Sequence, residues 1–132
     1  MHPSVIAVVD DEADITEALQ TLLSFKGVSC STHESAESLL CALTQQDGKL
    51  WLNMDDGRQA VLTTVLLDMN LPEMNGADLV LALRRLQPDV SLVMMTAALN
   101  EVVGSRAHDL HGVTMLAKPF TLKSLEQALQ LT

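Results

Sequence analysis

Residues Ser4–Val9 read SVIAVV, a short and largely apolar run that is followed directly by the acids Asp10 and Asp11. The run is long enough for a buried strand and too short for a helix. Residues 61–67, VLTTVLL, repeat the pattern and are followed by Asp68. Strands that are apolar along their whole length are typical of parallel sheets with helices on both faces.

The rest of the chain alternates in the same way. Segments between the apolar runs carry leucines at helical spacing, for example Leu19, Leu22 and Leu23 before Gly27, a residue type common at helix ends. The predicted strands are 4–9, 28–32, 61–67, 90–95 and 113–117. Five helices are predicted. Four of them contain Leu19, Leu39 with Leu43, Leu79 and Leu125, and the fifth spans about 100–109. Five strands alternating with five helices predict an α/β fold with a doubly wound parallel sheet.

Size and composition narrow the class of protein. A chain of 132 residues predicts one domain spanning 1–132, and 48% apolar residues exclude a disordered chain. No apolar run is long enough to span a membrane, and the stretch Met1-His2-Pro3-Ser4 lacks the basic flank and cleavage site of a signal peptide. Cys30 and Cys41 lack metal or disulfide spacing, which fits reduced thiols in a cytoplasmic protein. The net charge of −9 argues against nucleic-acid binding by this segment and favours a divalent cation or a basic partner.

One segment interrupts the alternation. Residues 47–60 contain the turn signals Asp47-Gly48 and Asp56-Gly57 on either side of an apolar Leu50-Trp51-Leu52. We interpret this segment as an insertion between the second helix and the third strand that forms a short hairpin. We expect it to lie away from the carboxyl ends of the strands.

Unusual polar residues follow four of the apolar strands. They are Asp10 with Asp11, Asp68, Thr96 and Lys118. Ligands of open parallel sheets bind at the carboxyl ends of the strands, so we expect these side chains to meet. Clustered carboxylates repel one another unless a hard cation such as Mg²⁺ or Mn²⁺ lies among them. Acids, a hydroxyl and an amine together predict a phosphoryl-transfer site with a carboxylate acceptor.

Each of these residues also has a simpler explanation when it is taken alone. Acids after the first strand suit the N-terminus of a helix, and Asp68 suits an Asx turn. Thr96 and Lys118 are ordinary as a hydroxyl at a strand end and a solvated amine. The simpler explanations do not predict that all of these groups follow separate apolar strands in this order.

The same residues resemble the receiver domain of bacterial two-component response regulators, from about Ser4 to the C-terminus. The matching stretches are 8–12 (VVDDE), 67–76 (LDMNLPEMNG), 95–97 (MTA) and 118–120 (KPF). The resemblance implies a flavodoxin-like fold with strand order 2-1-3-4-5. It also implies a signalling domain rather than an enzyme, one that acts only in its own phosphorylation and dephosphorylation.

Roles for the acidic residues follow from this resemblance. Asp68 corresponds to the aspartate that a histidine kinase phosphorylates. Asp11 corresponds to a direct Mg²⁺ ligand, and Asp10 to one that acts largely through water. Asn70 corresponds to the residue that offers its backbone carbonyl to the metal, for which Mn²⁺ is an alternative.

The resemblance also implies a conformational switch. Thr96 corresponds to the hydroxyl that moves onto the phosphoryl group, and Lys118 to the amine that pairs with it. Together they alter the face formed by helix four, strand five and helix five. Met115 stands where the family usually has Tyr or Phe, so the readout departs from the usual pattern. The residues expected to shape the surrounding loops are Pro72, Gly76 and Pro119, the last commonly preceded by a cis bond.

The implied partners are a sensor histidine kinase or a phosphotransfer protein, together with a C-terminal effector domain or a partner protein, and a phosphorylation-dependent homodimer. Two alternatives stay open. One is a pseudo-receiver that binds partners without phosphate. The other is a haloacid-dehalogenase-type hydrolase, which would need a second Asp where Asn70 stands.

Overall fold

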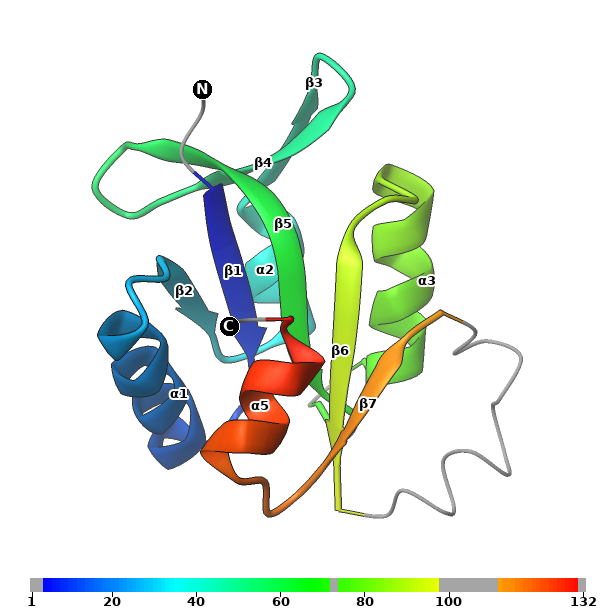
Figure 1. The fold of residues 1–132 in the computed structure, drawn as a ribbon. Helices are drawn as coiled ribbons and strands as arrows, with labels where there is room; N and C mark the ends of the chain where they lie inside the picture. Colours follow the sequence, from blue (N-terminus) through cyan, green and yellow to red (C-terminus); the bar gives the residue numbers. More distant parts are fainter. Residues whose placement is uncertain (1–3, 72–73, 98–111, 131–132) are drawn as a thin grey trace.

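The computed structural model describes residues 4–71, 74–97 and 112–130 (Figure 1). The strands are β1 (Ser4–Val9), β2 (Cys30–His33), β3 (Leu43–Gln46), β4 (Lys49–Asn53), β5 (Gln59–Asp68), β6 (Ser91–Thr96) and β7 (Thr114–Ala117). The helices are α1 (Ala13–Phe25), α2 (Ala36–Cys41), α3 (Gly76–Leu86) and α5 (Leu122–Ala128). In the described part of the chain, no helix is both long and apolar enough to cross a membrane.

The centre of the molecule is a parallel sheet. Strand β1 pairs with β2 and β5, β5 pairs with β6, and β6 pairs with β7, all in parallel. The order β2-β1-β5-β6-β7 is the predicted order 2-1-3-4-5 of the five apolar runs, and the predicted fold class is confirmed. The helix expected at 100–109 lies outside the described residues.

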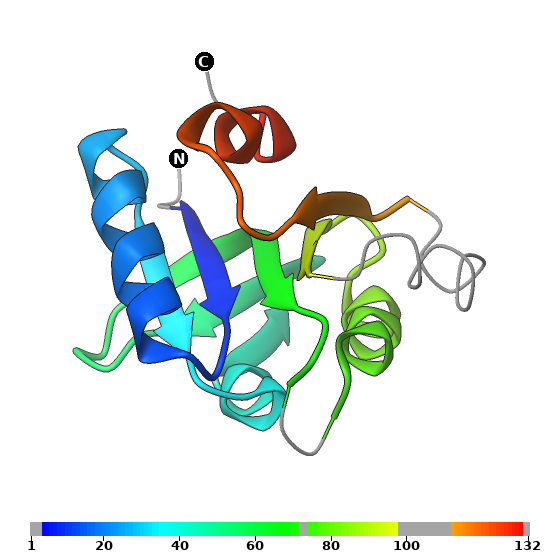
Figure 2. The same cartoon turned by 90° about the horizontal axis from the view of Figure 1, so that it is seen from below.

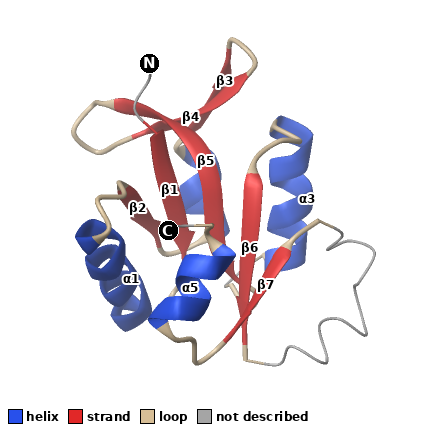
Figure 3. Ribbon diagram, in the orientation of Figure 1, coloured by secondary structure: helices blue, strands red, loops and turns tan. Residues whose placement is uncertain are grey.

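An antiparallel hairpin adds two strands that were not counted among the predicted five (Figure 3). It begins at Leu43 rather than at residue 47, because β3 pairs with β4 around a tight turn at Asp47 and Gly48. Both turn residues have positive φ, 55° and 72°, as two-residue hairpin turns require. Leu43 was predicted to lie in the second helix, but α2 ends at Cys41 and Leu43 pairs with Leu52.

The hairpin is an integral part of the fold. Strand β4 pairs with the start of β5, at the opposite end of that strand from Asp68 (Figure 1). Leu50 and Leu52 of β4 are 1% and 0% exposed and belong to the main core. The Gln45 side chain donates to the Leu86 carbonyl at 2.6 Å, which fastens the hairpin to the end of α3. The expected location away from the carboxyl ends is therefore confirmed.

Helices cover both faces of the parallel sheet (Figure 2). Helices α1 and α5 pack on one face, where the buried leucines are Leu19, Leu23 and Leu125. Helices α2 and α3 pack on the other face, where they are Leu39, Leu79 and Leu83. Because aromatic residues are scarce, the buried residues of both layers are aliphatic side chains and methionine.

Candidate functional site

Four strands bring their polar residues to one edge of the sheet, the lower edge in Figure 1 and the edge seen in Figure 2. Asp10 follows β1, Asp68 ends β5, Thr96 ends β6 and Lys118 follows β7. The register aligns them, because Asp68 is level with Met95 next to Thr96. Residues that are far apart in the sequence meet here because parallel strands end at the same edge.

An acidic cluster forms the centre of this edge. One carboxylate oxygen from each of Asp10, Asp11, Glu12 and Asp68 lies within 4.8 Å of all the others. Asp10 and Asp68 are buried, whereas Asp11 and Glu12 are exposed. Oxygen donors in this number suit a hard divalent cation such as Mg²⁺ and do not suit a thiophilic metal.

Glu12 was not among the predicted site residues. Its backbone N–H donates to Asp10 Oδ1 at 2.9 Å, which turns the chain so that the two carboxylates lie on the same side. The only sign in the sequence that Glu12 belongs to the site is its place directly after Asp11. Three adjacent acids do not indicate which of their side chains face the site.

Lys118 bridges the two buried acids. Its Nζ lies 3.0 Å from Asp10 Oδ2 and 3.4 Å from Asp68 Oδ1, and its side chain is 16% exposed. Burial alone would lower the pKa of Lys118, but the hydrogen bond to Asp10 and the charges of both carboxylates together raise it. The side chain is therefore a charged ammonium at neutral pH.

Asp68 lies in a more acid-rich environment than an ordinary surface carboxyl. Burial raises its pKa, and the negative charge of Asp10 raises it further. The Lys118 charge and a hydrogen bond from the Asn70 backbone act in the opposite direction without cancelling this effect. A cation placed among these carboxylates would favour the ionised form of Asp68, which is the form that can act as a nucleophile.

Thr96 is buried beside this cluster. Its hydroxyl donates to Met69 Sδ at 3.9 Å, and its backbone carbonyl accepts from the Lys118 N–H at 2.8 Å. This second bond fixes the start of the segment after β7 and so helps to hold Lys118 at the site.

The loops around the site are tightly packed. A Cβ at Gly76 would lie 2.8 Å from both the Asp68 carbonyl oxygen and Met69 Cα, so only glycine fits there. The Lys118-Pro119 peptide bond is cis. Asn70 is exposed at the surface of the β5–α3 loop, and Pro72 lies outside the described residues.

Met115, expected at the aromatic switch position, is half-buried in β7 opposite Met94. It packs against the core layer of α2 and α3, whereas the next residue, Leu116, packs in the layer of α1 and α5.

Comparisons with known proteins match this architecture. The family model for the response regulator receiver domain matches residues 6–130. The transcriptional regulator NtrC of Azospirillum brasilense is 27% identical over 95% of this chain, which corresponds to 23% of that relative. The response regulator SaeR of Staphylococcus aureus is 26% identical over 91% of this chain and 46% of that relative. The chain thus spans less than half of the length of these curated relatives, 23% of one and 46% of the other.

Solved structures show the same fold. A response regulator receiver domain protein from Clostridium thermocellum is 22% identical with a TM-score of 0.74, covering 96% of this chain and 91% of that one. The chemotaxis protein CheY4 of Vibrio cholerae is 24% identical with a TM-score of 0.71, covering 98% of both chains.

Proposed function

The chain belongs to the response regulator receiver family, and from that premise we propose that Asp68 accepts a phosphoryl group in a Mg²⁺-dependent reaction. The donor is the phosphohistidine of a sensor histidine kinase or a phosphotransfer protein. An Asp68 carboxylate oxygen forms a bond to phosphorus while the bond between phosphorus and the imidazole nitrogen breaks. The electron pair of the broken bond stays on the imidazole, which then takes up a proton.

The observation that carries this proposal is the position of Asp68 next to groups of opposite charge, a carboxylate and an ammonium. Asp10 lies on one side of it, and Lys118 contacts both carboxylates. In the proposed reaction the Lys118 ammonium transfers its hydrogen bond to a phosphoryl oxygen, a stronger charge-assisted bond. This would fix the phosphoryl group on the side of the site that faces β7.

The donor set fits the metal that the family implies. Asp11 would bind Mg²⁺ directly, Asp10 would act largely through water, and Asp68 would supply a third oxygen with the Asn70 backbone carbonyl. Mn²⁺ has the same preference for oxygen ligands and is an alternative. When bound, the ion neutralises charge that builds up on the phosphoryl oxygens. Glu12, at the exposed side of the cluster, is an additional acid near this site.

The elements next to the site would pass the effect of phosphorylation on to a partner. The proposed switch has Thr96 reorient towards the phosphoryl group while Met115 adjusts in β7. In the family this change reaches the face of helix four, strand five and helix five, of which β7 and α5 lie within the described residues. Gly76 supports this switch by letting the start of α3 pack closely on the backbone of Asp68 and Met69. Pro119 is proposed to help shape the loop that follows Lys118. Pro72 is proposed to help shape the loop that follows Asp68.

We assign the output to a C-terminal effector domain or a separate partner protein in the cytoplasm, with homodimerisation upon phosphorylation as a second form of output. The two curated relatives are described as a transcriptional regulator and a response regulator, and the matched region makes up 23% and 46% of their lengths. The receiver family is a signalling family. The negative charge of this segment leaves any nucleic-acid binding to another part of the protein.

Acetyl phosphate with Mg²⁺ provides the test. The parent protein should gain one phosphoryl group, seen by intact mass, and Asp68→Asn should gain none. Asp14→Asn, which removes an exposed acid from the first turn of α1, is the matched control and should label like the parent. A phosphate-independent pseudo-receiver would show no labelling of the folded parent, and labelling of Asp68→Asn would reject the acceptor assignment.

A further inference from the structure

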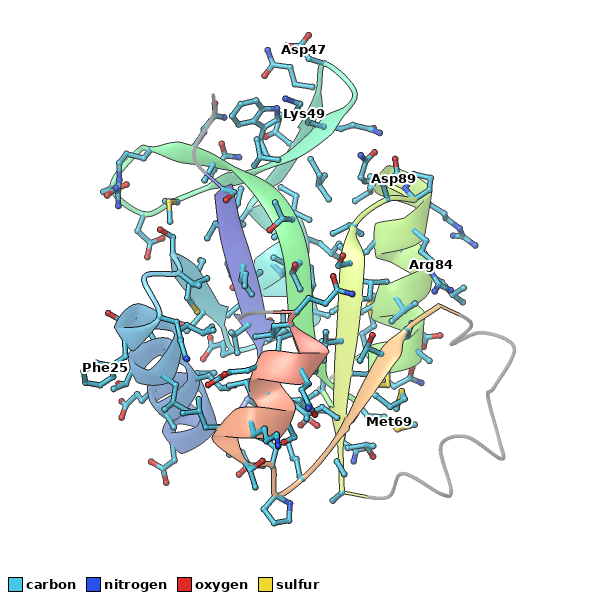
Figure 4. All side chains as sticks on the ribbon, viewed as in Figure 1. Phe25, Asp47, Lys49, Met69, Arg84 and Asp89 are labelled. Carbon is cyan, nitrogen blue, oxygen red and sulfur yellow. The ribbon has the colours of Figure 1, made fainter. Side chains whose placement is uncertain are left out.

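Directly after Asp68, a methionine sulfur faces the hydroxyl of the switch threonine. The Thr96 hydroxyl donates to Met69 Sδ at 3.9 Å, within reach of a weak hydrogen bond to sulfur. Thr96 is buried and Met69 is half-buried, so the contact lies at the inner side of the site. Met69 lies near the lower ends of β6 and β7, at the opposite end of the molecule from the hairpin tip at Asp47 (Figure 4).

The position of Met69 is fixed by its backbone. Its N–H donates to the Met95 carbonyl at 3.0 Å, and its carbonyl accepts from the Gly76 N–H at 2.7 Å. Gly76 also packs so closely on Met69 Cα that no Cβ would fit between them. Both peptide groups of Met69 are therefore held, which fixes where its side chain leaves the backbone beside Thr96.

The Thr96 hydroxyl has two possible acceptors, the Met69 sulfur and a phosphoryl oxygen on Asp68, which differ strongly in hydrogen-bond strength. A thioether is a neutral and weak acceptor, whereas a phosphoryl oxygen is charged and forms shorter and stronger hydrogen bonds. The Thr96 hydroxyl has one proton and cannot give it to both. A weak partner in the resting state would hold the hydroxyl in one orientation, yet release it when a charged oxygen is placed on Asp68.

We propose that Met69 is a positioning residue that holds the Thr96 hydroxyl in the resting orientation and sets how readily it turns to the phosphoryl group. This inference rests on the function proposed above, because it describes the regulation of the same site. Met69, the residue directly after the acceptor Asp68, would then act in the switch and not only in packing.

Two substitutions of Met69 separate hydrogen bonding from packing. Leucine keeps an apolar side chain of similar volume but offers no acceptor, so Met69→Leu should remove this hydrogen bond. Glutamine has similar length and ends in an amide oxygen, a stronger acceptor than sulfur, so Met69→Gln should hold it more firmly. Met54→Leu is the matched control, since Met54 is also half-buried but lies by the hairpin, far from Asp68.

The first measurement is the ¹³C chemical shift of the Thr96 methyl group in the free protein. The resonance should move in Met69→Leu and stay unchanged in Met54→Leu. An unchanged Thr96 resonance in both Met69 variants would overturn the proposal, whether or not the protein binds a phosphoryl mimic.

The second measurement is the affinity for beryllofluoride with Mg²⁺, a mimic of the phosphoryl group on Asp68. A weak hydrogen bond predicts about two- to fivefold tighter binding in Met69→Leu, and weaker binding than the parent in Met69→Gln. In a Thr96→Val background, which lacks the hydroxyl, Met69→Leu should have no effect. An effect of the same size in that background would show that Met69 acts through packing, which rejects the inference. Failure of the parent to bind beryllofluoride would instead reject the proposed function, and the methyl resonance would still decide the role of Met69.

Discussion

Replacing Lys118 with methionine removes the one cation that contacts both buried carboxylates among the described residues, and it keeps a side chain of similar length. In the parent, Nζ lies 3.0 Å from Asp10 and 3.4 Å from Asp68. At an effective dielectric constant of about 20, each of these contacts is worth about 5 kcal/mol of Coulomb attraction. Most of that attraction is offset by the cost of removing the three charges from water.

The variant loses the attraction but keeps both carboxylates buried. Breaking a buried ion pair costs about 3–5 kcal/mol because the remaining charge is uncompensated. Since Lys118 is 16% exposed, water can enter the vacated space, and we expect the lower value of about 3 kcal/mol. For a domain of this size, the melting temperature should fall by roughly 10 °C.

Urea unfolding followed by circular dichroism, without divalent cations, measures this loss. Lys118→Met combined with Asp10→Asn should recover a large part of it, because one of the two repelling charges is gone. Lys123→Met, at an exposed position of α5, should stay within about 0.5 kcal/mol of the parent. The difference should shrink as the pH falls and the carboxylates protonate. A Lys118→Met protein as stable as the parent at neutral pH would refute the idea that this ammonium holds the site together.

Two further predictions concern the hairpin and the thiols. Leu52→Ala should lower the free energy of unfolding by about 2–5 kcal/mol because Leu52 is fully buried. Gln46→Ala, at an exposed position of the same hairpin, should lower it by less than about 0.5 kcal/mol. Equal urea midpoints for the two variants would show that the hairpin does not contribute to the stability of the fold. Burial raises the pKa of the Cys30 thiol to about 11, so at mildly alkaline pH iodoacetamide should modify the exposed Cys41 well before Cys30, as peptide mass mapping would show. Both thiols should react alike in urea, and equal rates in the folded protein would contradict the burial of Cys30.

The parallel core could be predicted from the sequence because its signals are local. Runs such as 5–9 are apolar at successive positions, which is typical of a strand covered on both faces. Asp10, Asp68, Thr96 and Lys118 could be placed at one edge because each follows such a run, and parallel strands end together.

The hairpin was only partly predictable. Its turn at Asp47-Gly48 was visible, but its start at Leu43 was not, because a leucine fits either a short helix or a strand. Pairing with Leu52 places Leu43 in strand β3, and that contact exists only once β4 has docked on β5.

The sequence by itself determined which residues stand at the carboxyl ends of the strands, since each apolar run ends close to the end of its strand. Only the tertiary structure decided what those residues contact there. Lys118 bridges Asp10 and Asp68, and Thr96 donates to Met69, because β1, β5, β6 and β7 lie side by side and end at the same edge of the sheet. Such contacts join groups as much as 108 positions apart in the chain, and a local pattern carries no information about distances of a few ångströms between them.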